Sequence, residues 1–158
     1  MPNFFYDKIW DIPLSLLQEN NIKCLLLDID NTLTLHDDPN PHKSAVEWLA
    51  LASEAGIKSI IISNNIEPRV APFADGLRLQ CICHAKKPLS KGVNQAVVLT
   101  EIPKENMLLI GDQIFTDVLC GKFAGVKTVL VTPFEFEKTR FFRLKRWFER
   151  LILKEKRK

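Results

Sequence analysis

CLLLDIDNTLT, residues 24–34, runs from four apolar residues directly into two aspartates that are separated by one isoleucine. The run Cys24–Leu27 is typical of a strand that is buried on both faces of a parallel sheet. Asp28 and Asp30 then follow the end of that strand, where their like charges repel each other. The pair therefore predicts either a carboxyl group that resists ionisation or a cation close by.

The rest of the chain alternates short apolar runs with stretches of helical period, which is the signature of a parallel sheet flanked by helices. We expect strands at 23–28, 58–63, 79–84, 107–111 and 127–131. We expect helices at 42–55, 67–74, 91–99 and 116–124. The predicted fold is α/β, a Rossmann-like three-layer α/β/α sandwich with a central parallel sheet.

The composition is that of a globular protein. The 158 residues are 46% hydrophobic and 26% charged, and no apolar run approaches the ~20 residues of a membrane span. Asp7 and Asp11 interrupt the N-terminal stretch, which argues against a signal peptide. The four cysteines lie in apolar segments, so we expect no disulfide framework and a reducing, cytoplasmic location.

Charge is unevenly distributed along the chain. Residues 138–158 hold ten of the 22 Lys/Arg residues and two of the 19 Asp/Glu residues. Phe141, Leu144 and Phe148 recur among these cations at helical spacing. We therefore predict a domain spanning 1–137 and a basic amphipathic helix at 138–158. Such a helix suits the anionic inner face of a membrane, with packing on the protein's own core and the less favoured RNA binding as alternatives.

Polar residues follow the predicted strands. Parallel strands bring their carboxyl ends to one edge of the sheet, where open α/β folds bind ligands. The residues expected at this edge are Asp28, Asp30, Ser63, Lys87, Asp112 and Asp117. Converging carboxylates suit Mg²⁺, which needs one or two of them beside a substrate phosphate. A hydroxyl and a lysine next to them fit phosphate chemistry through a carboxylate nucleophile.

Four motifs between Asp28 and Asp117 resemble those of haloacid dehalogenase (HAD) phosphohydrolases. They are DIDNT (28–32), ISN (62–64), AKKP (85–88) and GDQIFTD (111–117). The stretch SNNIEPRV, read with the last two motifs, is similar to the YqeG-like group of subfamily IIIA and its relatives, the phosphatidylglycerophosphate phosphatases. Lys122-Phe123 stands where close relatives are expected to have Asn-Arg, a departure outside the four motifs that bears on substrate or partner contacts.

The resemblance implies roles for the three aspartates that match the first and last motifs. Asp28 would attack phosphorus and become an aspartyl-phosphate. Asp30 would protonate the leaving oxygen and then take a proton from the hydrolytic water. Mg²⁺ would be held by the Asp28 carboxylate, the Asp30 backbone carbonyl and Asp112. The implied activity is Mg²⁺-dependent phosphomonoester hydrolysis.

The resemblance also implies a set of residues around the phosphoryl group. Those expected to bind it are Ser63, Asn64 and Lys87. Thr32 and Asp117 would support them, with Asp117 orienting Lys87 or a metal-bound water. Arg69, one turn into the next helix, is a candidate for substrate contact, with a solvated surface arginine as the alternative.

The spacing of the motifs leaves no room for a cap domain. Only 35 positions separate Asp28 from Ser63, and only 24 separate Ser63 from Lys87. The predicted loop, helices and strands occupy nearly all of these positions. We therefore expect an open site, covered at most by the loop 34–41, and a bulky phosphorylated substrate. The resemblance makes phosphatidylglycerophosphate the leading candidate. The alternatives are a soluble small-molecule phosphatase and a membrane- or RNA-docking module with secondary catalysis.

Two further interpretations are weaker. A phosphorylated signalling receiver also gathers aspartates at sheet ends, but it would place its phosphoacceptor on a later strand than the acidic pair. Cys81, Cys83 and His84 offer three candidate zinc ligands where a closed structural site needs four. We expect both cysteines to lie on one face of a strand and to be buried. The sequence does not indicate an oligomeric state.

Overall fold

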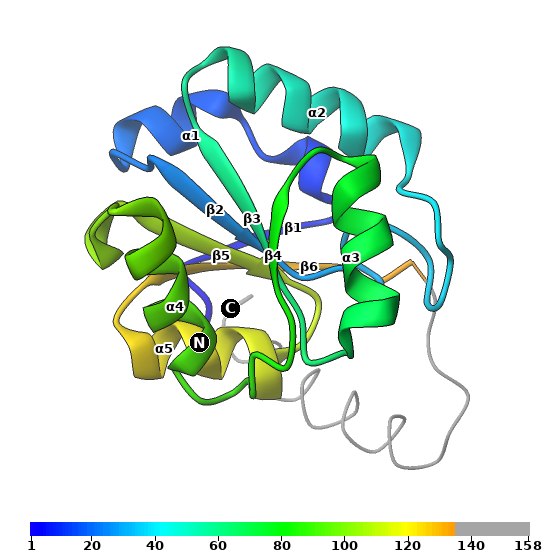
Figure 1. Ribbon diagram of the computed structural model, residues 1–158. Helices are drawn as coiled ribbons and strands as arrows, with labels where there is room; N and C mark the ends of the chain where they lie inside the picture. The colour runs from blue at the N-terminus through cyan, green and yellow to red at the C-terminus, as the bar shows by residue number, and fades with distance from the viewer. Residues whose placement is uncertain (135–158) are drawn as a thin grey trace.

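The computed structural model describes residues 1–134, so the predicted basic helix at 138–158 and the domain boundary at 137 lie outside the described residues. Within this range the chain forms one parallel sheet with the strand order β1-β6-β5-β2-β3-β4 (Figure 1). The strands are β1 (Phe4–Tyr6), β2 (Cys24–Leu27), β3 (Lys58–Ile62), β4 (Gln80–Ile82), β5 (Met107–Gly111) and β6 (Lys127–Val131). The predicted α/β class is confirmed.

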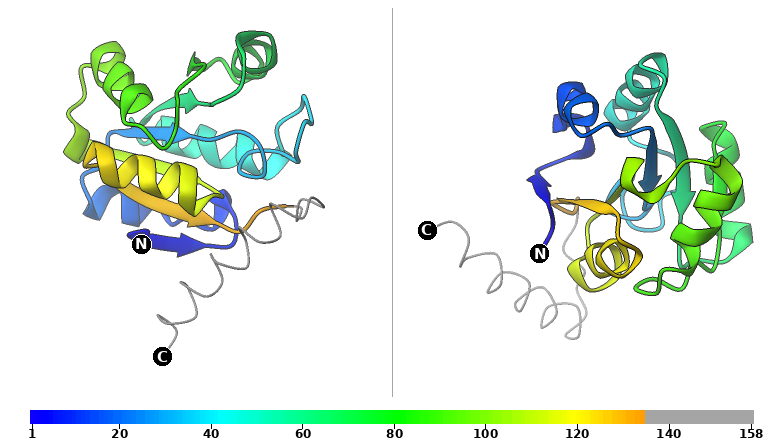
Figure 2. Two further views of the ribbon diagram at one scale, coloured as in Figure 1. Left: turned by 90° about the horizontal axis from the view of Figure 1, so that it is seen from below. Right: turned by 90° about the vertical axis from the view of Figure 1, so that its left-hand side faces the viewer.

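Helices cover both faces of this sheet, which gives the predicted three layers (Figure 2). The α-helices are α1 (Leu14–Glu19), α2 (Lys43–Glu54), α3 (Glu67–Gly76), α4 (Lys91–Thr100) and α5 (Leu119–Ala124). Short 3₁₀ turns form at Ile9–Asp11 and Lys104–Asn106, and a π-helical segment at Ile114–Val118 leads into α5. In this part of the chain, no helix is long and apolar enough to cross a membrane.

Strand β2 explains the unbroken apolar run that opens the first motif. Leu25 and Leu27 belong to the core cluster that packs against α2 and α3, whereas Cys24 and Leu26 belong to the cluster under α4 and α5. All four side chains are fully buried. Burial of each leucine stabilises the fold by about 1.5–3 kcal/mol. A polar residue on either face of this strand would therefore disrupt one of the two helical layers.

The N-terminal segment contains elements that the apolar pattern does not predict. Residues 4–6 pair in parallel with Val129, Leu130 and Val131 and add an edge strand to the sheet. The short helix α1 and the turn before it follow, and Ile9 and Leu17 enter the core. A strand of three residues and a helix of six are too short to establish a period, so only packing against the neighbouring elements reveals them.

The strand order places a topological switch beside β2. From β2 the chain continues to β3 and β4 on one side, and it then returns to β5 and β6 on the other side. In open α/β sheets, ligands bind at the carboxyl ends of the strands where the order reverses. The Asp28 N–H donates a hydrogen bond of 3.0 Å to the Ile110 carbonyl, which joins the ends of β2 and β5 at that point. The fold therefore places the first and fourth motifs side by side.

Candidate active site

Lys87 lies at the centre of the carboxyl edge of the sheet. Its Nζ is 2.6 Å from Oδ1 of Asp28 and 2.6 Å from Oδ1 of Asp117. The Lys87 side chain is 3% exposed and that of Asp117 is 1% exposed. A lysine this deeply buried is tolerated only when its ammonium group is paired and hydrogen-bonded. These two contacts join the first, third and fourth motifs at one nitrogen atom.

More negative than positive charge gathers at this point. Carboxylate oxygens of Asp28, Asp112 and Asp117 lie within 4.8 Å of one another. Burial raises the pKa of Asp28 to about 7, although the charge of Lys87 opposes the shift. Burial alone would lower the pKa of Lys87, but the charges of Asp117 and Asp28 outweigh it and the pKa is raised. Burial thus dominates the raised pKa of Asp28, whereas the two neighbouring carboxylates account for the net rise in the pKa of Lys87.

The same cluster fits a hard divalent cation. Such ions prefer carboxylate oxygens, and Asp28, Asp112 and Asp117 each direct one into the group. Asp112 is wholly buried, whereas the Asp28 side chain is 13% exposed and can be reached from outside. Of the predicted metal ligands, the carboxylates of Asp28 and Asp112 come together, and Asp117 joins them. The Asp30 carboxylate belongs to a different cluster, and the ligand role predicted for its backbone carbonyl stays a prediction.

Asp117 reaches Lys87 because Gly111 has no side chain. A Cβ atom at Gly111 would overlap the carboxylate of Asp117, so any larger residue would displace it. Oδ2 of Asp117 also accepts hydrogen bonds from the Gln113 N–H at 3.1 Å and the Thr116 hydroxyl at 3.3 Å. The fourth motif thus combines a glycine that permits close approach with donors that orient the carboxylate. This arrangement agrees with the predicted role of Asp117 in orienting Lys87.

Asn64 holds the backbone of Lys87. Its Oδ1 accepts a hydrogen bond of 2.7 Å from the Lys87 N–H, and its Nδ2 donates one of 3.0 Å to the Lys87 carbonyl. The predicted role of Asn64 is phosphate binding, but in this structure both ends of its amide are used to position Lys87. Ser63 is 3% exposed, and its Oγ accepts a hydrogen bond from the Asn65 N–H at 3.1 Å. The second motif therefore shapes the turn after β3 and fixes the segment after β4.

Thr32 is the supporting residue of the first motif. Its side chain is 1% exposed, and its hydroxyl has no hydrogen-bond partner among the described residues. A buried hydroxyl without a partner is costly, because it has lost its contacts with water. Thr32 thus keeps a donor that a bound group at the end of β2 could use.

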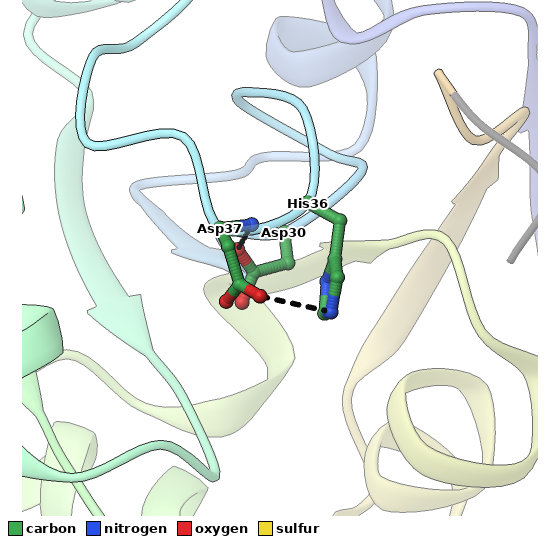
Figure 3. Close-up of side chains that lie close together, drawn as sticks. All are labelled: Asp30, His36 and Asp37. Carbon is green, nitrogen blue, oxygen red and sulfur yellow. Dashed lines mark hydrogen bonds and ion pairs between the residues drawn. The ribbon is translucent and has the colours of Figure 1, made fainter.

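Asp30 lies in a second cluster, together with the loop 34–41. Figure 3 shows Asp30, His36 and Asp37 close to one another. The Asp37 N–H donates a hydrogen bond of 3.2 Å to Oδ1 of Asp30, and Nε2 of His36 lies 3.5 Å from Oδ2 of Asp37 (Figure 3). His36 and Asp37 are exposed, so water competes strongly for any ion bound there. The buried cluster of Asp28, Asp112 and Asp117 is therefore the better candidate for a metal site.

Two side chains from the segment after β3 bind the Asp30 carboxylate. One guanidinium nitrogen of Arg69 lies 2.9 Å from Oδ1 of Asp30 and 3.0 Å from the Asp38 carbonyl. Nδ2 of Asn65 donates a hydrogen bond of 2.9 Å to Oδ2 of Asp30. The Arg69 side chain is 21% exposed, so it is neither a solvated surface arginine nor directed at the centre of the site. Asn65 is a residue that the motif pattern does not single out.

Cys81 and Cys83 lie at the edge strand β4 and are only half-buried, which makes the prediction of full burial wrong. An edge strand is covered less completely than a central one. The two Sγ atoms are 4.0 Å apart, as expected for residues on one face, and both side chains pack against the core cluster. Burial raises the pKa of Cys81 to about 11, which keeps it a neutral thiol. Among residues 1–134, the clusters with metal-binding geometry contain aspartate and histidine but no cysteine.

The chain resembles known proteins in sequence. A family model described as HAD-hydrolase-like matches residues 84–139. The chain is also 41% identical over 153 residues to the probable phosphatase YqeG of Bacillus subtilis, which covers 97% of this chain and 89% of that protein. The match therefore extends over all four motifs.

Solved structures share the fold. A putative HAD subfamily III A hydrolase from Legionella pneumophila aligns with a TM-score of 0.52 and 23% identity, over 63% of this chain and 60% of that one. The cobalt-bound deoxy-D-mannose-octulosonate 8-phosphate phosphatase of Haemophilus influenzae aligns with a TM-score of 0.56 and 18% identity. This alignment covers 72% of this chain and 80% of that one. Since the curated relative matches nearly the whole chain and these structures share its architecture, the chain belongs to the HAD hydrolase superfamily, in the YqeG-like group of phosphatases.

Proposed function

We propose that this protein hydrolyses a phosphomonoester through an aspartyl-phosphate on Asp28, and that the substrate is a phospholipid with phosphatidylglycerophosphate as the leading candidate. One observation supports the chemistry above the others. Asp28 is partly exposed at the switch point, beside a buried lysine and two further carboxylates. A proposed nucleophile, a cation suited to phosphate and candidate metal ligands are thus close together at one edge of the sheet.

The proposed reaction has two steps. In the first, an Asp28 oxygen bonds to phosphorus, the bond to the leaving oxygen breaks, and Asp30 gives that oxygen a proton. In the second, water bonds to phosphorus, Asp30 takes a proton from it, and inorganic phosphate leaves with Asp28 restored. Lys87, oriented by Asp117, would bind the phosphoryl oxygens throughout. A divalent cation, for which we propose Mg²⁺, would neutralise Asp28 and Asp112 and polarise the phosphoryl oxygens.

Exposed apolar side chains at the same edge support a lipid substrate. Each of the four segments that follow a site strand carries one: Leu35 after β2, Ile66 after β3, Leu89 after β4 and Phe115 after β5. Their exposed fractions lie between 38% and 59%. Apolar side chains at the mouth of a phosphate site suit a leaving group with acyl chains. The cations of 138–158 would add attraction to an anionic surface.

The test is phosphate release, measured with and without Mg²⁺. Phosphatidylglycerophosphate in mixed micelles is compared with soluble phosphomonoesters, and Asp28→Asn serves as the blank. We expect Mg²⁺-dependent release that is faster for the lipid. A full-length variant with Arg143, Lys145 and Arg146 changed to Gln should lose part of the lipid activity while keeping activity on soluble esters.

The other outcomes separate the parts of the proposal. Turnover restricted to soluble esters would keep the chemistry and reject the lipid substrate. Release that persists in Asp28→Asn, or no release from any ester, would reject the chemistry and favour a docking module.

A further inference from the structure

The Asp30 carboxylate accepts hydrogen bonds from three different segments. Asn65 at the end of β3 donates to Oδ2, Arg69 of α3 donates to Oδ1, and the Asp37 N–H of the loop donates to Oδ1 as well. The Asp30 side chain is 15% exposed, so water competes only weakly with these contacts. An aspartate on a turn would otherwise change rotamer readily. The three donors therefore select one orientation of the group that must move protons.

Arg69 contributes most to this orientation because the same nitrogen also binds the loop. Its Nη2 donates to Oδ1 of Asp30 and to the Asp38 carbonyl, so one atom links the carboxylate to the loop 34–41. The Thr34 hydroxyl closes the base of this loop on the Asn40 carbonyl. The guanidinium lies 5.7 Å from the centre of the Phe73 ring, which limits its movement on the α3 side. Asp30 cannot turn without breaking the Arg69 contact or moving the loop.

We propose that Arg69 is a positioning residue for Asp30, which couples the orientation of this acid/base group to the position of the loop 34–41. The inference rests on the proposed function, because it requires Asp30 to protonate the leaving oxygen. Arg69 acts through Asp30 and not on the phosphate, so its loss should affect the proton transfer and leave phosphate binding unchanged. Esters whose leaving groups need a proton will reveal this difference.

The first experiment compares two esters that differ in their leaving group. An alkyl phosphate needs a proton on its departing oxygen, whereas p-nitrophenyl phosphate expels a stable phenolate without one. In Arg69→Gln we expect the rate of the first step, measured as release of the leaving group in a single turnover, to fall on the order of 10–100-fold for the alkyl ester. For p-nitrophenyl phosphate we expect this rate to change by less than about threefold, because its leaving group needs no proton. The second step, in which Asp30 acts as the base, is the same for both esters and does not enter this comparison. The substrate concentration that gives half the maximal rate should stay near the wild-type value for both esters.

The second experiment is a double-mutant cycle with Asp30→Asn. If Arg69 acts through Asp30, then Arg69→Gln adds no further loss of the first-step rate for the alkyl ester once Asp30 has been replaced. Arg78→Gln is the matched control, since Arg78 follows the end of the same helix, is exposed and lines a groove with Lys58 and Ser59 at the start of β3, whereas Asp30 lies at the carboxyl edge of the sheet. We expect wild-type kinetics for this control.

A third measurement follows the stability of the loop 34–41 and does not depend on enzyme turnover. Amide hydrogen exchange of residues 35–40 should become faster in Arg69→Gln and stay unchanged in Arg78→Gln, since the Asp38 carbonyl loses its partner. Equal loss of the first-step rate for both esters, or loss that persists in Asp30→Asn, would overturn the inference, and so would weaker substrate binding alone. Those results would leave Asp28-dependent hydrolysis intact. No Asp28-dependent release from any ester would overturn the proposed function and this inference together.

Discussion

At the scale of the residue, the site depends on one buried ammonium group. Lys87 neutralises part of the charge of three carboxylates, two of which it contacts at 2.6 Å. Removing one partner of a buried ion pair leaves the other charge without compensation. We therefore expect the pairing to be needed for stability as well as for the proposed binding of a phosphoryl group.

Lys87→Met tests this double role. The variant keeps the length of the side chain but leaves Asp28 and Asp117 without their cation. We expect the free energy of unfolding to fall by about 3–5 kcal/mol in the absence of Mg²⁺, and phosphate release to be lost. Urea denaturation measures the first effect. Lys86→Met is the control. Lys86 is exposed, so we expect this substitution to change neither stability nor phosphate release. Equal effects of the two substitutions would contradict the double role of Lys87.

The raised pKa of Asp28 predicts a pH dependence of stability. Unfolded aspartate has a pKa near ~3.9, whereas burial raises the folded value to about 7. Between these values the folded state holds a proton that the unfolded state has released. Stability without metal should therefore fall as the pH rises from about 4 to about 7, by at most ~1.4 kcal/mol per pH unit, and level off above.

Urea denaturation in EDTA at pH 5, 6, 7 and 8 measures this slope. Asp28→Asn serves as the reference, because it removes the titrating group while other groups still titrate. A wild-type slope equal to that of Asp28→Asn would show that Asp28 ionises as freely in the folded protein as in the unfolded chain.

At the scale of the element, the segment after β5 shows why a motif has its spacing. The chain passes from the strand through a π-helical turn, Ile114–Val118, before α5 begins. This turn directs Asp117 back over Gly111, where a Cβ atom would overlap its carboxylate. The predicted helix at 116–124 thus begins earlier and is not α-helical at its start, because the carboxylate must return to the sheet.

Gly111→Ala should displace Asp117 and with it the orientation of Lys87. We expect a loss of about 1–3 kcal/mol of stability from overpacking, and a lower rate of phosphate release. Gly76→Ala is the matched control: a Cβ there meets nothing within 4 Å, and the position ends helix α3. That control should be neutral or slightly stabilising. Thermal unfolding distinguishes the two, and a tolerated Gly111→Ala would refute the steric argument.

At the scale of the whole molecule, the carboxylate cluster predicts linkage between metal binding and folding. A cation that binds the folded state alone adds about 2.7 kcal/mol of stability at a concentration 100-fold above its Kd. We expect Mg²⁺ to raise Tm in the wild type and to do so much less in Asp112→Asn, since Asp112 is wholly buried in the cluster. Calorimetry with and without EDTA is the measurement. An equal rise in Asp30→Asn and Asp112→Asn would place the cation elsewhere.

The pattern of apolar residues in the sequence predicts most of the strands of the sheet. The strands at 107–111 and 127–131 are confirmed with their bounds, and those at 23–28, 58–63 and 79–84 are confirmed with shorter ends. The carboxyl ends differ because the chain turns away from the sheet after Asp28 and Ser63, whose N–H groups still donate to the carbonyls of Ile110 and Ile82. The expectation of polar residues at one edge is also confirmed, since it requires only that the strands be parallel.

By itself, the sequence determined the fold class, and it predicted the edge of the sheet at which Asp28, Lys87, Asp112 and Asp117 come together, because strand period and the residues that follow each strand can be read locally. Only the tertiary structure decided how these side chains are used. Asn64 positions Lys87, and Arg69 binds Asp30 across 39 positions of the chain. Those contacts depend on how the segments after β2, β3 and β4 pack against one another, and no local pattern in the sequence encodes that packing.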